Sequence, residues 1–460
     1  MKLLDRSVPL WFLMAALTLW IAITVTFGWL VKSRLNADDD DGLLREVVLG
    51  VASFPDLVVE ATREIKGFVT GTYKERAIRL LRDETADYSD FTAIPAASGL
   101  NIQGLLMKVD RDRISNGWRL LVGAFSIDDD FENAALLLSP ELEIVRVWVL
   151  DEKKIGSRNP KPKHRKFIHG VEFLPDASII YTFDGGVSLQ RVDVCGRNIW
   201  ATEGGFNHTV SLDGKGETVW SFSGNSLAQV SVSDGSLLRV IEFQDIIDAN
   251  PMIDILGIRQ NNGADNEHEN PRNYHGGWMG DRFHRNDVEP LPSAMESSFP
   301  DFSAGDLLVS LRSLNLVFVV DPDTRHIKWW RMGATERQHD PDWNSNGTVT
   351  ILNNRMTQNF SEIVSISPEN FEKSTLFDGR KNDFFTRIRG KHQVLDTGEI
   401  LVASSQQGRF FEVDPNGEVS LEIVNTKPGS DDTNYVVSEV IWYAPQSLNL
   451  DTQACQSSGN

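Results

Sequence analysis

Five histidines stand at the start of similar β-rich segments, although they lie far apart in the sequence. The chain contains nine histidines, so more than half of them share this position. Neutral histidine is a good nucleophile near pH 7 and is also a common metal ligand. A single one would be expected only to hydrogen-bond a neighbouring loop, but five in equivalent places indicate a site for an anion or a metal ion. The five are His169, His208, His284, His339 and His392.

An anion is the favoured ligand. Arg312 lies in a predicted strand that follows His284, and a guanidinium matches the oxygen pairs of a sulfate or phosphate group. Attack by a histidine next to such a clamp describes the transfer of a sulfuryl or phosphoryl group. A nucleotide donor is disfavoured, because the sequence has no P-loop and no GxGxxG at a strand-to-helix turn.

A metal ion is the alternative ligand. None of the five histidines belongs to a close pair such as HxH or HExxH, and Asp340 is the one obvious carboxylate beside them. Metal sites built from histidine generally need several such donors in a defined geometry. We therefore predict neither a metal nor another cofactor.

The histidines also mark a repeat. After each of them the sequence gives a turn, a hydrophobic strand, a second turn, a strand ending near an aspartate and a last strand. Residues 105–150 look like a sixth unit without the histidine. Six four-stranded units of roughly 40 to 55 residues are typical of a β-propeller. We predict an all-β, six-bladed β-propeller over residues 100–446, with the five histidines around one end of its central channel.

The N-terminal segment has a different character. Residues 8–31 contain no charged residue, and about 20 apolar helical residues cross a bilayer core of roughly 30 Å. Trp11 and Trp29 lie near its ends, as interfacial aromatic residues do. We expect an uncleaved transmembrane anchor at residues 1–35, with a cleaved signal peptide as the alternative. Lysine and arginine are balanced on its two sides and leave the orientation open.

Three further segments complete the predicted organisation. Apolar residues at helical spacing over residues 43–82 predict a short helical, membrane-proximal region within residues 36–99. The polar insertion at residues 257–282 is expected to be either a lid or a disordered loop. Residues 447–460 are expected to form a C-terminal tail.

The composition restricts the partners. The formal net charge is −20, and such a surface repels nucleic acid. The two cysteines, Cys195 and Cys455, are too few for a disulfide framework and leave the cellular compartment open.

Four short motifs follow one another as they do in bacterial arylsulfotransferases. FHRNDV contains HxN, SLRSLN contains SxRxxN, WRMG matches WxxG, and QHD precedes a strand that ends in two asparagines. The chain therefore resembles this family over roughly residues 165–425. The matching residues are His284, Asn286, Ser310, Arg312, Asn315, Trp330, Gly333, Gln338, His339, Asp340, Asn353 and Asn354.

The resemblance implies a specific activity. Such enzymes are six-bladed propellers, exported from the cytoplasm, that transfer a sulfuryl group from a phenolic sulfate ester to another phenol by a ping-pong route without a nucleotide donor. Their nucleophile matches His339, which would become a sulfohistidine, while His284 and Arg312 match residues that bind the sulfate oxygens. A further histidine from an earlier blade would complete the catalytic set; we expect His208, with His169 second. Asp340 would orient His339 or its loop. Substrate contacts are expected from His169, His392, Asn286, Asn315 and Asn354.

A different class of function stays open. Propellers serve many purposes, so the chain could be a binding or scaffold subunit of a membrane-associated complex, with a metal at the histidine ring or with a second copy of itself as partner. As an enzyme it would meet aryl sulfates and phenols on the periplasmic or extracytoplasmic side of a membrane. Convergence of His284, Arg312 and His339 on one pocket with a shared anion site would favour the enzyme, and a failure to converge would count against it.

Overall fold

The computed structural model of the chain describes residues 10–35, 79–81, 87–153, 155, 166–184, 186–256, 283–430, 433–448 and 455. The insertion at residues 257–282 and most of the predicted helical region at residues 43–82 lie outside these ranges. The described part of that region is β1 (Arg79–Leu81), which is a strand and not a helix. Its backbone pairs with β28 (Thr433–Tyr435), so its hydrogen bonds go to a neighbouring strand.

The N-terminal segment forms α1 (Leu10–Leu35). Within the described ranges, we find no helix that combines the length and the apolar character needed to cross a bilayer. The predicted helix is thus confirmed, whereas the predicted membrane crossing is not found.

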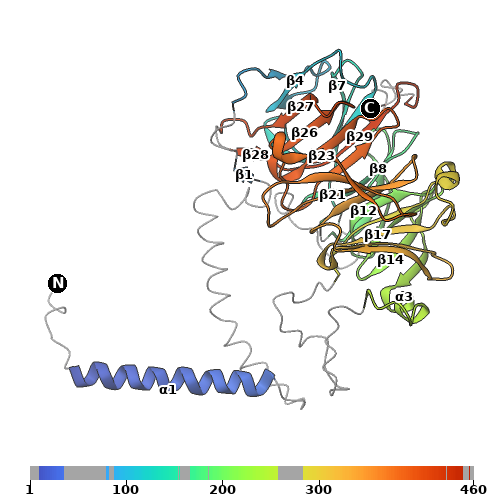
Figure 1. Cartoon of the computed structure of the whole chain (residues 1–460). Helices are drawn as coiled ribbons and strands as arrows, with labels where there is room; N and C mark the ends of the chain where they lie inside the picture. The colour runs from blue at the N-terminus through green and yellow to red at the C-terminus, as the bar shows by residue number, and fades with distance from the viewer. Residues whose placement is uncertain are drawn as a thin grey trace, which may run out of the picture. The chain divides into compact units, whose positions relative to one another are not determined.

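The predicted all-β, six-bladed propeller is confirmed by six sheets arranged around one axis (Figure 1). Four blades are antiparallel sheets of four consecutive strands each. From the axis outward they are β8 (Ile168–Phe173), β9 (Ile179–Phe183), β10 (Ser188–Val192) and β11 (Asn198–Glu203); β12 (Phe206–Leu212), β13 (Thr218–Ser223), β14 (Ser226–Ser231) and β15 (Leu237–Glu242); β16 (Arg285–Pro290), β17 (Leu307–Leu311), β18 (Leu316–Val320) and β19 (Ile327–Met332); and β20 (His339–Asn344), β21 (Thr348–Asn353), β22 (Glu362–Ile366) and β23 (Lys373–Asp378).

The other two blades mix strands from both ends of the chain. The blade of β24 (Lys391–Val394), β25 (Ile400–Ser404), β26 (Arg409–Val413) and β27 (Val419–Asn425) is extended outward by β4 (Leu105–Val109) and β2 (Thr92–Ala93). Figure 1 shows the blue β4 beside the orange-red β27. The last blade consists of β29 (Val437–Tyr443), β5 (Trp118–Ile127), β6 (Asp130–Leu138) and β7 (Ile144–Val149), and β3 (Ile102–Gln103) also pairs with β5.

This exchange corrects the prediction that residues 105–150 form a complete unit. They contribute only β5, β6 and β7 to their blade, while β4 joins the neighbouring one. The innermost strand of that blade is β29, so antiparallel pairing between the two ends of the chain closes the ring. The innermost strands β8, β12, β16, β20, β24 and β29 contact one another in this cyclic order.

Short helices lie in the connections between strands. The α-helix α3 (Phe243–Ala249) follows β15, and the 3-10 turns are η3 (Ser293–Ser298), η4 (Arg312–Leu314), η5 (Gly379–Lys381) and η6 (Ser405–Gln407).

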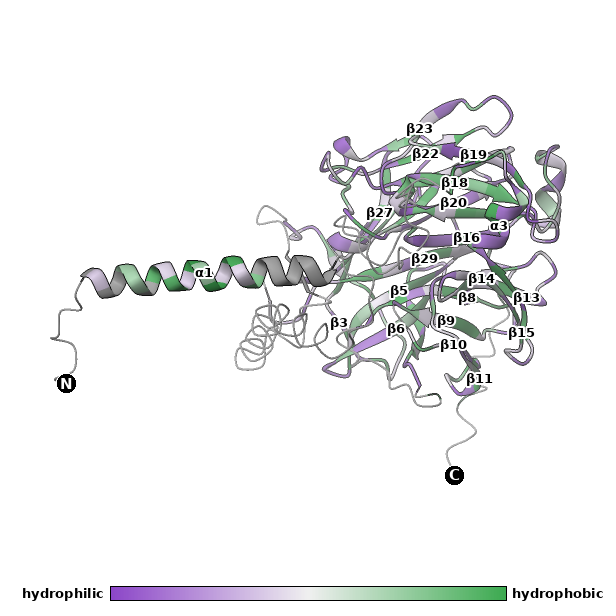
Figure 2. Ribbon diagram, turned by 90° about the horizontal axis from the view of Figure 1, so that it is seen from below, coloured by the Kyte–Doolittle hydropathy of each residue, from purple (hydrophilic) through white to green (hydrophobic). Residues whose placement is uncertain are grey.

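The blades are held together by apolar layers between neighbouring sheets. In β17, Leu307 and Val309 pack toward the blade of β12–β15, whereas Leu308 packs toward that of β20–β23. Successive side chains of a strand point to opposite faces, and each fully buried large aliphatic side chain stabilises the fold by about 1.5–3 kcal/mol. Figure 2 shows the result: β18 is hydrophobic, whereas β16 at the axis is hydrophilic. The polar residues are therefore concentrated at the channel.

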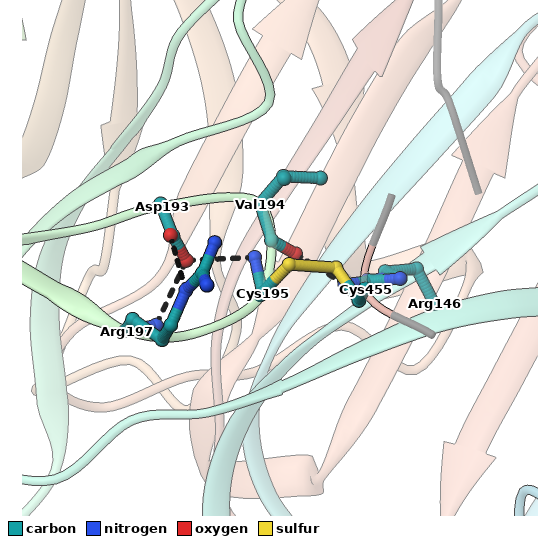
Figure 3. The surroundings of a disulfide bond; sticks show 6 residues. All are labelled: Arg146, Asp193, Val194, Cys195, Arg197 and Cys455. Atoms are coloured by element: carbon teal, nitrogen blue, oxygen red, sulfur yellow. Dashed lines mark hydrogen bonds and ion pairs between the residues drawn. A yellow bond between two sulfur atoms is a disulfide. The ribbon is translucent and has the colours of Figure 1, made fainter. Parts of the chain in front are cut away.

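Both cysteines form a disulfide bond (Figure 3). Cys195 lies in the turn between β10 and β11, and Cys455 lies beyond β29. The Asp193 carboxylate accepts the backbone N–H of Cys195, and Arg146 donates to the carbonyl of Val194 beside the bond. The disulfide ties the segment after the closing strand to the next blade of the ring and restricts the unfolded chain.

Candidate active site at the propeller axis

A small hollow lies on the axis, and all six blades contribute to its wall. Its volume is about 10 Å³, which is room for about one water molecule. Three of the predicted histidines and Asn286 line it. The other lining residues lie in β20, at or just before the start of β24, in η6 and in β29. The lining residues are His169, His208, Asn286, His339, Asp340, Arg389, Gly390, Lys391, Ser405 and Ser438.

Irregular strand pairing aims these side chains at the axis. A β-bulge places an extra residue on one strand and redirects its side chain. The register shifts in five of the six innermost strands, and a lining residue lies within each shift: His169, His208, Asn286, Asp340 and Ser438. The sixth, β24, pairs with β25 without a shift, and there Lys391 rather than His392 reaches the hollow.

Three histidine rings form a chain that includes His169 and His208 in the wall of the hollow and continues to His284, which does not line it. The ring centroids of His169 and His208 are 4.4 Å apart, and those of His208 and His284 are 5.4 Å apart. Burial lowers the pKa of His208 to about 3 and the pKa of His169 well below its ordinary value of 6.5, with nearby positive charges adding to the effect. These rings are therefore neutral at pH 7, and the lasting positive charge comes from arginine and lysine.

His339 is held in one orientation by its neighbours. Its Nδ1 lies 2.7 Å from Asn354 Oδ1, while Asn354 Nδ2 donates to the carbonyls of Thr386 and Arg389 at 2.7 and 2.8 Å. Because both carbonyls need the amide N–H groups, the Asn354 oxygen must face the ring, and His339 Nδ1 carries the proton. The lone pair is then on Nε2, which accepts the backbone N–H of Arg389 at 3.2 Å.

Electrostatics keep His339 uncharged. Burial lowers the pKa of His339 well below 6.5, and the charge of Arg312 lowers it further, although the bond to Asn354 works in the opposite direction. Arg312 and His284 do not line the hollow, but both act on this pKa. A neutral imidazole with one fixed lone pair beside guanidinium groups is a nucleophile placed for an anionic substrate.

The remaining motif residues build the frame for these groups. Asn286 Nδ2 donates to the carbonyl of Gln338 at 2.6 Å, directly before His339. Asn315 ends the turn η4 in a left-handed conformation (φ 49°), and its Oδ1 accepts the N–H of Arg337 at 2.9 Å. Asn315 thus connects the Arg312 turn with the loop that leads to His339, and it does not line the hollow.

A second cavity, of about 380 Å³, follows along the axis and is strongly acidic. Lys391 lines both cavities and separates them: its Nζ lies 2.7 Å from Asp287 Oδ2 and 2.6 Å from Asp340 Oδ1. Burial raises the pKa of Glu172 to about 7, and burial and neighbouring carboxylates raise that of Glu439 well above 4.5. The carboxylates of this cavity belong to Glu172, Asp287, Glu289, Asp340, Asp342 and Glu439.

One group in this cavity has the spacing of metal ligands. Donor atoms of Asp340, Asp342 and His392 lie within 4.8 Å of one another. His392 Nδ1 is 2.8 Å from Asp340 Oδ2, and its Nε2 is 3.0 Å from Thr350 Oγ1. A metal ion would have to displace these bonds and the contact of Asp340 with Lys391, so the group fits a buried hydrogen-bond network better than a metal centre.

Two expectations therefore change in detail. His392 lies in this network, away from the other histidines, because β24 has no bulge. The residue that orients the His339 ring is Asn354, whereas Asp340 contacts Lys391 and His392.

Six residues of the site were missed in the sequence. Arg389, Gly390 and Lys391 stand directly before His392, so their position was a usable signal. Ser405 in η6, Ser438 in β29 and Asp184, which follows β9, gave no signal of their own.

Comparison with known proteins agrees with the motif pattern. The sequence model described as arylsulfotransferase (ASST) matches residues 170–426. No curated protein matches the chain. A protein of unknown function from Bacteroides caccae is 13% identical, with 70% of this chain and 98% of that chain covered and a TM-score of 0.45. A virginiamycin B lyase from Staphylococcus aureus is 10% identical, with coverages of 61% and 84% and a TM-score of 0.34. These two likenesses are too weak to support a functional argument.

Proposed function

The chain belongs to the arylsulfotransferase family, and from this premise we propose that it transfers a sulfuryl group from a phenolic sulfate ester to a phenol through a sulfohistidine at His339. The orientation of His339 carries the proposal. Its Nδ1 proton is fixed by Asn354, and its Nε2 lone pair is directed toward the Arg389 segment of the wall. No nucleotide donor is required.

The proposed reaction has two displacements at sulfur. In the first, the backbone N–H of Arg389 releases the lone pair of His339 Nε2, which forms a bond to sulfur while the bond from sulfur to the phenolic oxygen breaks, and the phenolate leaves with the electron pair. In the second, the oxygen of the acceptor phenol attacks the same sulfur and passes its proton to water, and the electron pair of the N–S bond returns to Nε2. Arg312 would stabilise the charge on the sulfuryl oxygens, with His284 and His208 as hydrogen-bonding partners nearby.

The substrate assay is direct. Purified protein should release 4-nitrophenol from 4-nitrophenyl sulfate, and added phenol should accelerate the release because it removes the sulfuryl group from the enzyme. Release that depends on a nucleotide sulfate donor, or no release under any condition, would contradict the proposal.

The pH dependence of this assay follows from the state of His339. Only the neutral ring can attack, and its lowered pKa keeps it neutral well below pH 6.5. The acid limb of the rate profile should therefore lie below pH 6.5, and a limb at pH 6.5 or above would show that the attacking group has an ordinary or raised pKa.

We further propose that the propeller works outside the cytoplasm. Structural disulfides persist in oxidising compartments, and the bond between Cys195 and Cys455 joins distant parts of the chain. Protein taken from cells and alkylated before reduction should carry no label on either cysteine. Labelling of both cysteines would contradict this location.

A further inference from the structure

We infer that Arg389 is a second guanidinium for the sulfuryl group, and that Asp184 holds it beside the hollow until an anion replaces that carboxylate. The inference rests on the proposed function and adds a residue that neither the motif pattern nor the proposed mechanism includes. It starts from the position of the Arg389 side chain in the wall of the hollow.

The Arg389 side chain spans two blades that are not neighbours. Arg389 precedes β24, whereas Asp184 follows β9, and the blade of β29 lies between these two blades in the ring. Arg389 Nη2 donates to Asp184 Oδ2, and the guanidinium carbon lies 4.1 Å from the centroid of the Phe167 ring. The ion pair therefore bridges the edge of the hollow on the side of the blade of β29.

The carbonyl of Arg389 anchors its loop, whereas its N–H and its side chain would change partner in the reaction. Its carbonyl accepts from Asn354 and its N–H donates to His339 Nε2. Arg389 itself is left-handed (φ 63°), a conformation that costs energy in a non-glycine residue. Gly390 follows at φ 100°, and a Cβ there would lie 2.8 Å from Leu352 Cδ1. These contacts and conformations therefore hold the Arg389 loop beside His339.

The pair with Asp184 is built to be exchanged. The Asp184 side chain is 39% exposed, whereas that of Arg389 is 15% exposed. Water reaches the Asp184 side of this pair and screens it in part, so the pair is weaker than a fully buried one. A sulfuryl group offers the same oxygen fork as a carboxylate, and a hollow of about 10 Å³ admits it only when wall side chains move. Rotation of Arg389 from Asp184 to the sulfuryl oxygens would supply the charge.

Two substitutions with opposite expected effects test this role. Arg389→Gln should raise the KM for 4-nitrophenyl sulfate and weaken the binding of inorganic sulfate about 10- to 100-fold, the range for a charged hydrogen bond. Asp184→Asn should strengthen sulfate binding several-fold and lower KM, because the competing carboxylate is gone. Arg380→Gln is the matched control: Arg380 pairs with Asp378 and does not line the hollow, so both constants should stay unchanged.

Isothermal titration with sodium sulfate provides the binding constants without turnover. If Asp184→Asn weakens sulfate binding as Arg389→Gln does, the ion pair only stabilises the structure and the inference is wrong. If neither substitution changes sulfate binding, it is wrong as well. If the wild-type protein transfers no sulfuryl group but both substitutions change sulfate affinity as expected, the proposed function is wrong and the anion site stands.

Discussion

His339→Gln should reduce the release of 4-nitrophenol from 4-nitrophenyl sulfate by at least about a thousandfold while the protein stays folded. Glutamine keeps a hydrogen-bonding group near Asn354, which lies 2.7 Å from the ring in the structure, but it has no lone pair able to attack sulfur. Because the covalent step itself is removed, added phenol should not restore the rate. The measurement is the initial rate at saturating substrate, together with a thermal unfolding curve.

A matched histidine substitution controls for unspecific effects. His326 is exposed in the turn before β19, so His326→Gln should retain the full rate. If His339→Gln keeps more than about a tenth of the wild-type rate, then His339 is not the nucleophile, because loss of an essential nucleophile costs far more.

Lys391→Met should lower the free energy of unfolding by about 3–5 kcal/mol. The substitution leaves Asp287 and Asp340 buried without the ammonium group that lies 2.7 and 2.6 Å from them. Denaturant-induced unfolding at pH 7 measures the loss. The control Lys108→Met removes an exposed pair with Asp90 and should cost less than about 1 kcal/mol. Equal stabilities of the two variants would show that the buried pair makes no net contribution.

The pH dependence of stability has a definite sign at this network. Burial opposes ionisation of Asp340, but Lys391 and His392 outweigh it and hold its pKa at about 2. A carboxyl group whose pKa is lowered in the folded state stabilises the protein above its unfolded pKa, near 4. This contribution is therefore complete at neutral pH and is lost as the pH falls from about 4 toward 2.

The repeat in the sequence was sufficient to predict the propeller, because four of the six blades are built from four consecutive strands and their turns. It could not show that β29 closes the ring, since that pairing joins the two ends of the chain. The β-bulges could not be predicted from the sequence either, and they decide which side chain reaches the axis. In β8, which has a bulge, it is His169, and in β24, which has none, it is Lys391. Motif residues such as Asn315 and Asn354 were assigned to the substrate, whereas their side chains bond to Arg337 and His339.

The charge state of the site depends on burial, which no local pattern reveals. The sequence did not show which groups at the hollow are charged, and burial keeps His169, His208 and His339 neutral. The positive charge at the hollow belongs to Arg389 and Lys391, two residues that precede the fifth histidine of the repeat.

The central claim is that His339 carries the sulfuryl group between donor and acceptor. Mass spectrometry of the protein after brief exposure to 4-nitrophenyl sulfate without an acceptor tests it most directly, with digestion at alkaline pH to preserve the N–S bond. The account predicts one added sulfuryl group on the peptide that contains His339, lost again on addition of phenol. Unmodified protein during turnover, or a sulfuryl group on another residue, would contradict it.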